Sequence, residues 1–305
     1  MIRSLISGFS GSSGSTPTSW VIRSATLDAG SLYAVGFNGS NLFVTININT
    51  NVYTSPDGVT WTKVASGIST FPYGITYSGT AFIIVGSNSN TTYPGIATST
   101  DGGITWTTIS TSSFGTTSNI RDVCWSGTYL VAVSNEGHIA TSTSTGSSWT
   151  QRYKEDSGIF YSVAYGGGMY VACGSMALAT SINGTSWTNR NSTKPSFTVN
   201  SVTYGNSKFV AVGNSGKIAT SADGINWTNI TSPFDTTIIR KVTYGNSKFV
   251  AVGDSGKIAT STDGINWKLS ESPVTTSLRG VVYGNSKFVA VGGGSPTIIT
   301  SPTGL

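Results

Sequence analysis

Short apolar runs alternate with polar turns along almost the whole chain. In residues 242–267, apolar and polar positions alternate over 242–244, and further apolar runs follow at 249–252 and 258–261. Glycine, asparagine, serine and aspartate separate these runs, as they do between strands joined by tight turns. No long segment has helical periodicity, so the pattern predicts a protein that is almost entirely β.

The pattern is also repeated. Residues 202–227 read VTYGNSKFVAVGNSGKIATSADGINW, and residues 242–267 read VTYGNSKFVAVGDSGKIATSTDGINW. The tryptophan at the end of each copy recurs about every 40 residues, which is the length of a four-stranded propeller blade. These tryptophans are Trp20, Trp61, Trp106, Trp149, Trp187, Trp227 and Trp267.

The two ends of the chain complement each other. An incomplete copy ends at residues 301–305, just before its tryptophan, whereas residues 19–23 look like a fourth strand without a blade. We therefore predict that residues 279–305 and the N-terminal strand form one composite blade, which closes the ring and removes its open sheet edges. The predicted fold is an all-β, seven-bladed β-propeller of four-stranded antiparallel blades over residues 17–305. Residues 1–16, rich in glycine and serine, are predicted to be a flexible anchor or linker.

Each tryptophan follows a turn of the form Ser-x-Asp-Gly, in which the aspartate can accept hydrogen bonds from the turn's own amides. These turns resemble the Asp boxes, or bacterial neuraminidase repeats, of a β-propeller family, with box positions at Asp57, Asp101, Asn183, Asp223 and Asp263. That family includes sialidases, lectin-like propellers, assembly factors of photosynthetic complexes and virion-associated phage proteins. The segment YGNSKFVAVG is most similar to segments of propellers in phage and bacterial surface or tail proteins. The resemblance therefore implies a fold rather than a single function.

Seven positions depart from the repeat in an informative way. They stand two residues before the repeated valine or isoleucine of each first strand, so a closed ring would gather them around one mouth of the central channel. They are Tyr33, Tyr73, Arg121, Tyr161, Asn200, Arg240 and Arg279. Tyrosine rings stack on sugars and arginine binds carboxylates or phosphates, so this channel-mouth ring is a candidate ligand site. Alternatively, the ring only closes the channel, with its arginines paired to acids such as Asp122 or Asp235.

The remaining ionisable residues give little support for catalysis. Of the 12 Asp and Glu residues, four serve the boxes, and no others show the pairing that glycoside hydrolysis requires. Asp254 is interpreted as a turn residue and His138 as an exposed strand residue. Cys124 and Cys173 fall in different blades and are interpreted as buried free thiols. No metal or cofactor site is predicted, because the chain has a single histidine.

Composition limits the choice of partners. Charged residues make up 10% of the chain and the net charge is +5, without any basic run, so neither nucleic acid nor membrane insertion is predicted. We expect a non-enzymatic phage virion protein with a structural or glycan-binding role, attached to other virion proteins through residues 1–16. A lectin of a bacterial surface and a sialidase-like hydrolase remain open. Lys208, Lys248 and Lys287 recur in only three copies, which argues against a regular multivalent lectin.

Overall fold

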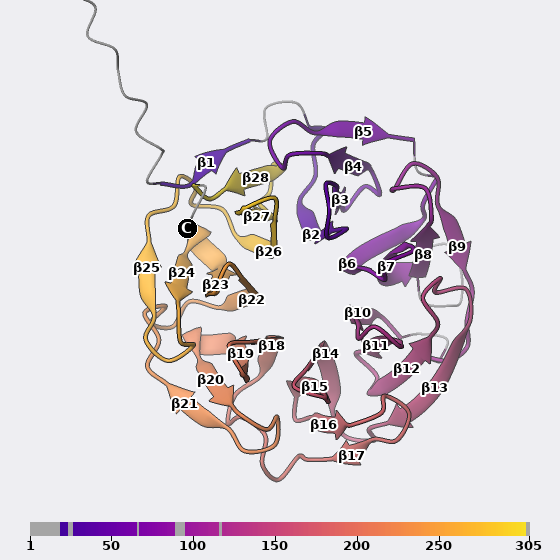
Figure 1. Cartoon of the computed structure of the whole chain (residues 1–305), viewed down its shortest axis with the longest axis vertical. Helices are drawn as coiled ribbons and strands as arrows, with labels where there is room; N and C mark the ends of the chain where they lie inside the picture. The colour runs from indigo at the N-terminus through magenta and orange to yellow at the C-terminus, as the bar shows by residue number, and fades with distance from the viewer. Residues whose placement is uncertain (1–18, 24–26, 66, 89–94, 116–117, 303–305) are drawn as a thin grey trace, which may run out of the picture.

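Seven four-stranded antiparallel sheets surround a central axis in the computed structural model (Figure 1). The predicted seven-bladed propeller is therefore confirmed. The only helical elements in the described part are two single 3₁₀ turns, η1 (Asn214–Gly216) and η2 (Asp254–Gly256). The expected anchor at residues 1–16 lies outside the described residues, which are 19–23, 27–65, 67–88, 95–115 and 118–302.

Each blade starts at the axis and runs outward. Blade 1 holds β2 (Leu32–Phe37), β3 (Phe43–Asn47), β4 (Val52–Ser55) and β5 (Thr62–Val64). Blade 2 holds β6 (Thr70–Tyr77), β7 (Phe82–Asn88), β8 (Gly95–Ser99) and β9 (Thr107–Ile109). Blade 3 holds β10 (Ile120–Trp125), β11 (Leu130–Ser134), β12 (His138–Ser142) and β13 (Trp149–Lys154). Blade 4 holds β14 (Ile159–Gly166), β15 (Met169–Ser175), β16 (Leu178–Ser181) and β17 (Thr188–Asn189).

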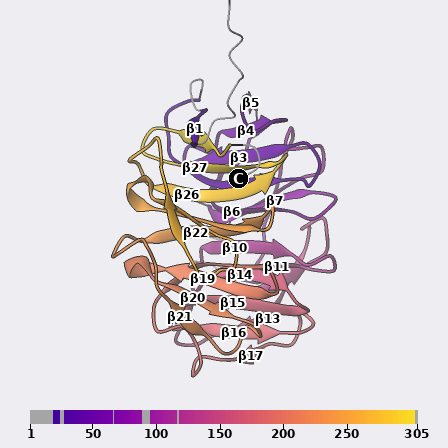
Figure 2. The same cartoon turned by 60° about the vertical axis from the view of Figure 1, so that its left-hand side comes forward.

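The remaining blades repeat this order. Blade 5 holds β18 (Val199–Gly205), β19 (Lys208–Gly213), β20 (Ile218–Ser221) and β21 (Thr228–Ile230). Blade 6 holds β22 (Ile239–Gly245), β23 (Lys248–Gly253), β24 (Ile258–Ser261) and β25 (Lys268–Ser270). Blade 7 combines β26 (Leu278–Gly284), β27 (Lys287–Gly292) and β28 (Thr297–Thr300) with β1 (Val21–Ile22) from the other end of the chain. Blades 1 and 7 consequently lie side by side, opposite blade 4 (Figure 2).

Strand β1 closes the ring as predicted. Val21 pairs with Thr300 and Ile22 with Ile299 in antiparallel register. The backbone amide of Arg23 extends the ladder by donating to the carbonyl of Ile298 at 2.7 Å. Without this strand, β28 would be the exposed outer edge of blade 7.

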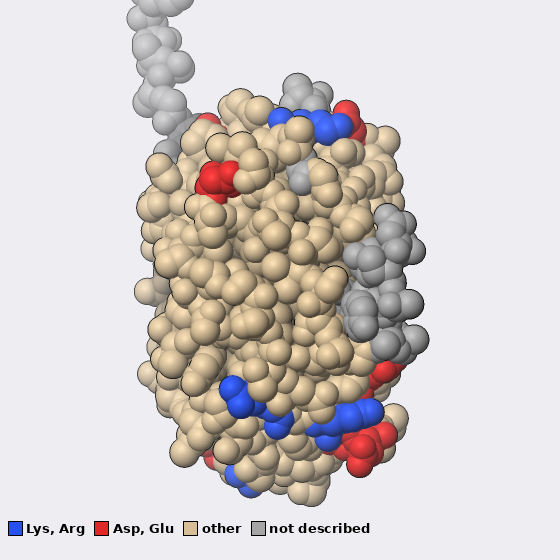
Figure 3. Space-filling view, turned by 90° about the vertical axis from the view of Figure 1, so that its right-hand side faces the viewer, with Lys and Arg blue, Asp and Glu red and all other residues tan. Residues whose placement is uncertain are grey.

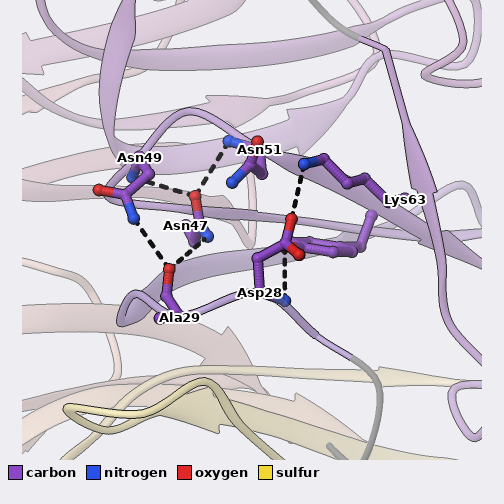
Figure 4. Close-up of polar contacts among 7 residues, drawn as sticks. Asp28, Ala29, Asn47, Asn49, Asn51 and Lys63 are labelled. Carbon is purple, nitrogen blue, oxygen red and sulfur yellow. Dashed lines mark hydrogen bonds and ion pairs between the residues drawn. The ribbon is translucent and has the colours of Figure 1, made fainter.

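A polar cluster holds the connection between β1 and β2 (Figure 4). The side-chain amides of Asn47 and Asn49 both donate to the carbonyl of Ala29, and Asn47 is fully buried. Lys63 forms an ion pair with Asp28 at 2.6 Å, but both side chains are half-exposed, so the pair adds little stability. The two amide bonds to Ala29, the shorter one from the exposed Asn49, therefore also hold this connection in place.

The hydrophobic core is divided into seven clusters, each between two neighbouring blades. Blades 2 and 3, for example, share Ile83, Ile96, Leu130 and Ala132, all without exposed surface. The repeat tryptophans pack against these clusters. Trp20 belongs to the cluster between blades 6 and 7, beside Phe288, and is 3% exposed. Every blade is therefore stabilised mainly by its two neighbours, as expected of a repeat architecture.

In the Ser-x-Asp-Gly turns the aspartate accepts hydrogen bonds from the turn's own backbone amides. In blade 6, Oδ1 of Asp263 accepts bonds from the amides of Ile265 and Asn266, both at 2.8 Å, and from the hydroxyl of Ser261. Trp267 closes the turn by donating its indole N–H to the carbonyl of Gly264 at 3.0 Å. Gly264 has φ of 74°, a conformation that glycine adopts without strain.

Blade 4 carries asparagine at the equivalent position. Oδ1 of Asn183 accepts bonds from the amides of Thr185 and Ser186 at 3.0 and 2.9 Å, as the aspartates do. The turn can therefore form around a neutral acceptor oxygen. For this reason we expect Asp263→Asn to cost less than Asp263→Ala, which should cost about 1 kcal/mol or more by leaving the amides without that acceptor.

The charge of these turns should make stability depend on pH. Hydrogen bonds lower the pKa of Asp101 to about 2, chiefly the bond from the Thr105 hydroxyl. They also lower the pKa of Asp223 and Asp263 well below the usual range, chiefly through a backbone amide of each turn. A lowered folded-state pKa adds stability above the unfolded value of about 3.9, and that stability is lost as the pH falls through the folded value.

We therefore expect a melting temperature that is steady above about pH 5 and falls between about pH 4 and pH 2. The Asp223→Asn/Asp263→Asn variant should show a shallower fall, because asparagine keeps the bonds without titrating. Thermal unfolding followed by circular dichroism across this range would check it. Parallel curves for parent and variant would contradict the assignment.

Candidate functional site

All seven residues of the channel-mouth ring occupy one special position in the backbone. In every blade the pairing of the first and second strands shifts by one residue at this position, so the ring residue is the extra residue of a β-bulge. In blade 3, Ile120 pairs with Ser134 and Asp122 with Val133, which leaves Arg121 unpaired. Bulges redirect side chains and are frequent at binding sites. The seven side chains are therefore presented by strands rather than by loose loops.

Five of these residues line one hollow of about 300 Å³: Tyr73, Arg121, Tyr161, Asn200 and Arg240. The other two, Tyr33 and Arg279, line a smaller cavity of about 40 Å³ that shares Tyr73 with the hollow. The structure thus places all seven residues at two adjoining cavities around the axis. Two guanidinium groups, two phenol rings and one amide line the larger hollow, and its lining includes no carboxylate among the residues described.

Two of the arginines stack on tyrosine rings. The guanidinium carbon of Arg121 lies 4.4 Å from the ring centre of Tyr73 and 5.7 Å from that of Tyr161. The guanidinium carbon of Arg279 lies 4.5 Å from the ring centre of Tyr33. The Nε atoms of both arginines are buried without a hydrogen-bond partner within the described structure. Stacking fixes each guanidinium in place and leaves its N–H edge available to a ligand.

Arg240 and Asn200 are held differently. Nε and Nη2 of Arg240 donate to the two carboxylate oxygens of Asp254 at 2.5 and 2.9 Å. The Asn200 amide donates to Asn214 Oδ1 at 2.9 Å and to the carbonyl of Ile239 at 3.0 Å. Asp254 and Asn214 each lie 14 residues after the ring residue that they bind, in the 3₁₀ turn of the same blade. These two ring residues are therefore already engaged.

Asp254 is a turn residue, as interpreted, and it also accepts both hydrogen bonds from the ring residue Arg240. Burial would raise the pKa of its carboxyl, but hydrogen bonds from Arg240 and Ser277 and the charges of Arg240 and Arg279 lower it overall. In the third of these similar copies, Gly293 stands 14 residues after Arg279 and provides no such carboxylate. The difference between Asp254, Asn214 and Gly293 is visible in the sequence, but the contact of this turn with the ring residue of the same blade is not.

A second layer of side chains lies one residue further along each first strand. Asp122 is 6% exposed and accepts bonds from Ser162 Oγ at 2.6 Å and from the amide of Val163 at 3.3 Å. Lys241, from blade 6, reaches both of its carboxylate oxygens at 3.2 and 3.3 Å. The alternative that the ring arginines pair with acids is therefore observed for Arg240, but with Asp254, whereas Asp235 pairs with Lys257 at 3.1 Å.

The recurring lysines have a structural role where the structure describes their partners. Lys208 donates to the backbone carbonyl of Asp263 at 2.8 Å, and Lys287 donates to that of Asp57 at 2.9 Å. Each lysine thus connects its blade to the Ser-x-Asp-Gly turn of the next blade in the ring. These bonds lie at the opposite face of the propeller from the channel-mouth ring, because strand direction alternates within each blade.

The other candidates lie outside the site. His138 is 6% exposed, so interpreting it as an exposed residue was wrong; burial lowers its pKa and favours the neutral ring. Cys124 and Cys173 are free, with Cys173 buried and Cys124 partly buried. Within the described ranges, no group of three or more His, Cys, Asp or Glu residues could hold a metal ion. No helix of that same part is long and apolar enough to span a membrane.

Several solved propellers are similar to this chain in fold. YCF48 bound to a D1 peptide is 18% identical with a TM-score of 0.73, and the match covers 94% of this chain and 96% of that one. YCF48 from Cyanidioschyzon merolae is 16% identical with a TM-score of 0.71, over 94% and 100% of the two chains. A catalytically inactive virginiamycin B lyase from Staphylococcus aureus with quinupristin is 10% identical with a TM-score of 0.78, over 92% and 98%.

At these identities the similarity shows a shared fold alone. No protein-family model matches the sequence, and no curated protein matches it. The similar folds include an enzyme as well as WD40 and YCF48 propellers, so the architecture does not select a function.

Proposed function

We propose that this propeller is a non-enzymatic recognition protein that binds an acidic, polyhydroxylated ligand, such as a charged glycan, at the channel-mouth ring. The observation that carries the proposal is the hollow lined by Tyr73, Arg121, Tyr161, Asn200 and Arg240. Tyrosine faces suit sugar rings, and arginine edges suit carboxylates and other anions. A concave surface with a few polar groups on rigid strands is typical of ligand sites.

The charge distribution favours an acidic ligand. Arg121 and Arg279 have no ion-pair partner in the part of the chain that the structure describes. Arg240 and Lys241 are compensated by Asp254 and Asp122. Two positive charges at the channel are therefore left without partners, and an anion would offset them.

The carboxylates near the ring do not favour catalysis. Asp254 accepts from two guanidinium nitrogens of Arg240, and Asp122 is buried with three donors around it. Neither is placed as a free acid or base next to the hollow. We therefore propose that the protein binds its ligand without converting it. Incubation with a glycan that binds, followed by analysis of the glycan, should show no cleavage product.

The wider setting of this proposal is a virion or a cell surface. The shared geometry of the Ser-x-Asp-Gly turns supports placing the chain among Asp-box-type propellers. Charged residues are 10% of the sequence, and Figure 3 shows a broad, nearly uncharged side wall around β9. A hydrated but weakly charged surface suits an extracellular or virion protein. The chain should co-purify with virions, and a variant without residues 2–16 should not. This result would support attachment through the N-terminal segment.

Arg121 gives the sharpest test of the proposed site. On an array of acidic and neutral glycans, Arg121→Gln should weaken binding of acidic ligands about 10- to 100-fold, the loss of a charge-assisted hydrogen bond. Arg152→Gln is the matched control, because Arg152 lies on the outer strand β13 and, within the described residues, donates to Thr141. Equal binding by the two variants would refute the site.

An acidic peptide is the second candidate ligand. YCF48, which shares the fold, is described as bound to a D1 peptide. The same arginines would serve a peptide that carries acidic side chains. An array of acidic peptides, probed with the same two variants, separates the candidates: peptide binding without glycan binding would assign this chain to protein recognition.

A further inference from the structure

The inner face of the propeller is asymmetric in its second layer. Through blades 3 to 6, polar side chains connect neighbouring first strands. Asp122 accepts from the amide of Val163, Ser162 from that of Val202 at 3.1 Å, and Ser201 from that of Val242 at 3.3 Å. Each bond joins one blade to the next.

The other side of the channel lacks such side chains. The equivalent residues in blades 7, 1 and 2 are Gly280, Ala34 and Gly74. Among the described residues, Gly280, Ala34 and Gly74 have no polar side chain that could bond to the next blade, and a small cavity of about 40 Å³ borders all three. We call this cavity the inner slot. Gly74 and Gly280 lie close to the first strand of the next blade, since a Cβ on Gly74 would stand 3.1 Å from Asp122 Cα and one on Gly280 3.2 Å from the Tyr33 carbonyl oxygen.

Two basic side chains line the inner slot, and one of them, Lys241, is paired with Asp122. Arg279 and Lys241 both line it, together with Tyr33 and Tyr73 and without any carboxylate among the described residues. The Nε of Arg279 is buried and has no hydrogen-bond partner in the described structure. The hydrogen bonds of Lys241 go to the two oxygens of Asp122, and an ammonium group has three N–H donors. The slot is therefore bordered by the unpartnered Nε–H of Arg279 and by the Lys241–Asp122 pair.

We propose that the inner slot binds a carboxylate group, which bridges blade 7 and blade 6 to blades 1 and 2. Its small volume favours a planar carboxylate over a tetrahedral phosphate or sulfate. Arg279 is stacked on Tyr33 and can present its N–H edge to such a group. We assign this carboxylate to the ligand of the channel-mouth ring, and this assignment rests on the proposed function. The ligand class is then an acid whose carboxylate enters the channel while its polar body stays in the hollow.

Sodium formate tests the slot without knowledge of the natural ligand. The melting temperature of the parent should rise with formate and saturate, since a ligand that binds only the folded state stabilises it. Arg279→Gln should raise the half-saturating concentration about tenfold or abolish the response. Arg152→Gln is the control for general salt effects, and Arg279→Lys, which keeps the charge, should keep part of the response. Inorganic phosphate should have a smaller effect than formate.

The outcomes separate the two proposals. Equal formate responses in the parent and Arg279→Gln, or phosphate stabilising as strongly as formate, would overturn the carboxylate slot. If an acidic ligand binds and depends on Arg121 but formate has no effect, the proposed function stands and the slot is wrong. If formate binds through Arg279 but no acidic ligand binds at the ring, the slot stands as an anion site and the proposed function fails.

Discussion

Removal of residues 2–23 is expected to lower the melting temperature by roughly 10 °C or more, because it deletes β1 and Trp20 together. Trp20 is 3% exposed within the core between blades 6 and 7, and truncating a buried tryptophan costs about 3–5 kcal/mol. The deletion also removes the pairing of β1 with β28 and exposes the outer edge of blade 7.

A shorter deletion, of residues 2–16, is the matched control, since it leaves every contact of β1 in place. Thermal unfolding of the parent and both deletions would check the prediction. Trp20→Ala would then separate the loss of core packing from the loss of the strand. Equal melting temperatures for the two deletions would mean that β1 does not stabilise the ring.

Replacement of Asp122 by alanine is expected to destabilise the protein by about 3 kcal/mol, at the low end for breaking a buried ion pair because Lys241 is partly exposed. The change leaves the ammonium of Lys241 without its counter-ion and near the other cations of the channel. It also removes the acceptor for Ser162 and Val163. Asp122→Asn should cost less, since it keeps an acceptor oxygen for these two donors.

Urea unfolding of Asp122→Asn, Lys241→Met and the double variant would give the coupling energy of the pair. We expect a coupling of about 1 kcal/mol or more, because the two side chains are in direct contact. Each substitution should then lower the free energy of unfolding more in the parent than in the variant that already carries the other substitution. Strictly additive effects would show that the pair only fills the channel.

The channel-mouth ring shows how far the repeat alone leads to a site. Aligning the copies was enough to select seven positions, because residues at one register position of every blade must face the same axis. The alignment did not distinguish Arg240, which Asp254 neutralises, from Arg279, whose equivalent turn position is Gly293. That distinction depends on which turn lies beside which strand.

The sequence by itself determined the number of blades, their order and the closure by the N-terminal strand. These features follow from local periodicity and from turns such as Asp263-Gly264, where a few neighbouring residues specify the backbone. Only the tertiary structure decided the pairing of Asp122 with Lys241, which are 119 residues apart. It also decided the burial of His138 and the side of the channel at which the second-layer residues are Gly280, Ala34 and Gly74. Contacts across a closed channel join blades that are not neighbours, and their partners depend on side-chain lengths and charges that the repeat does not encode.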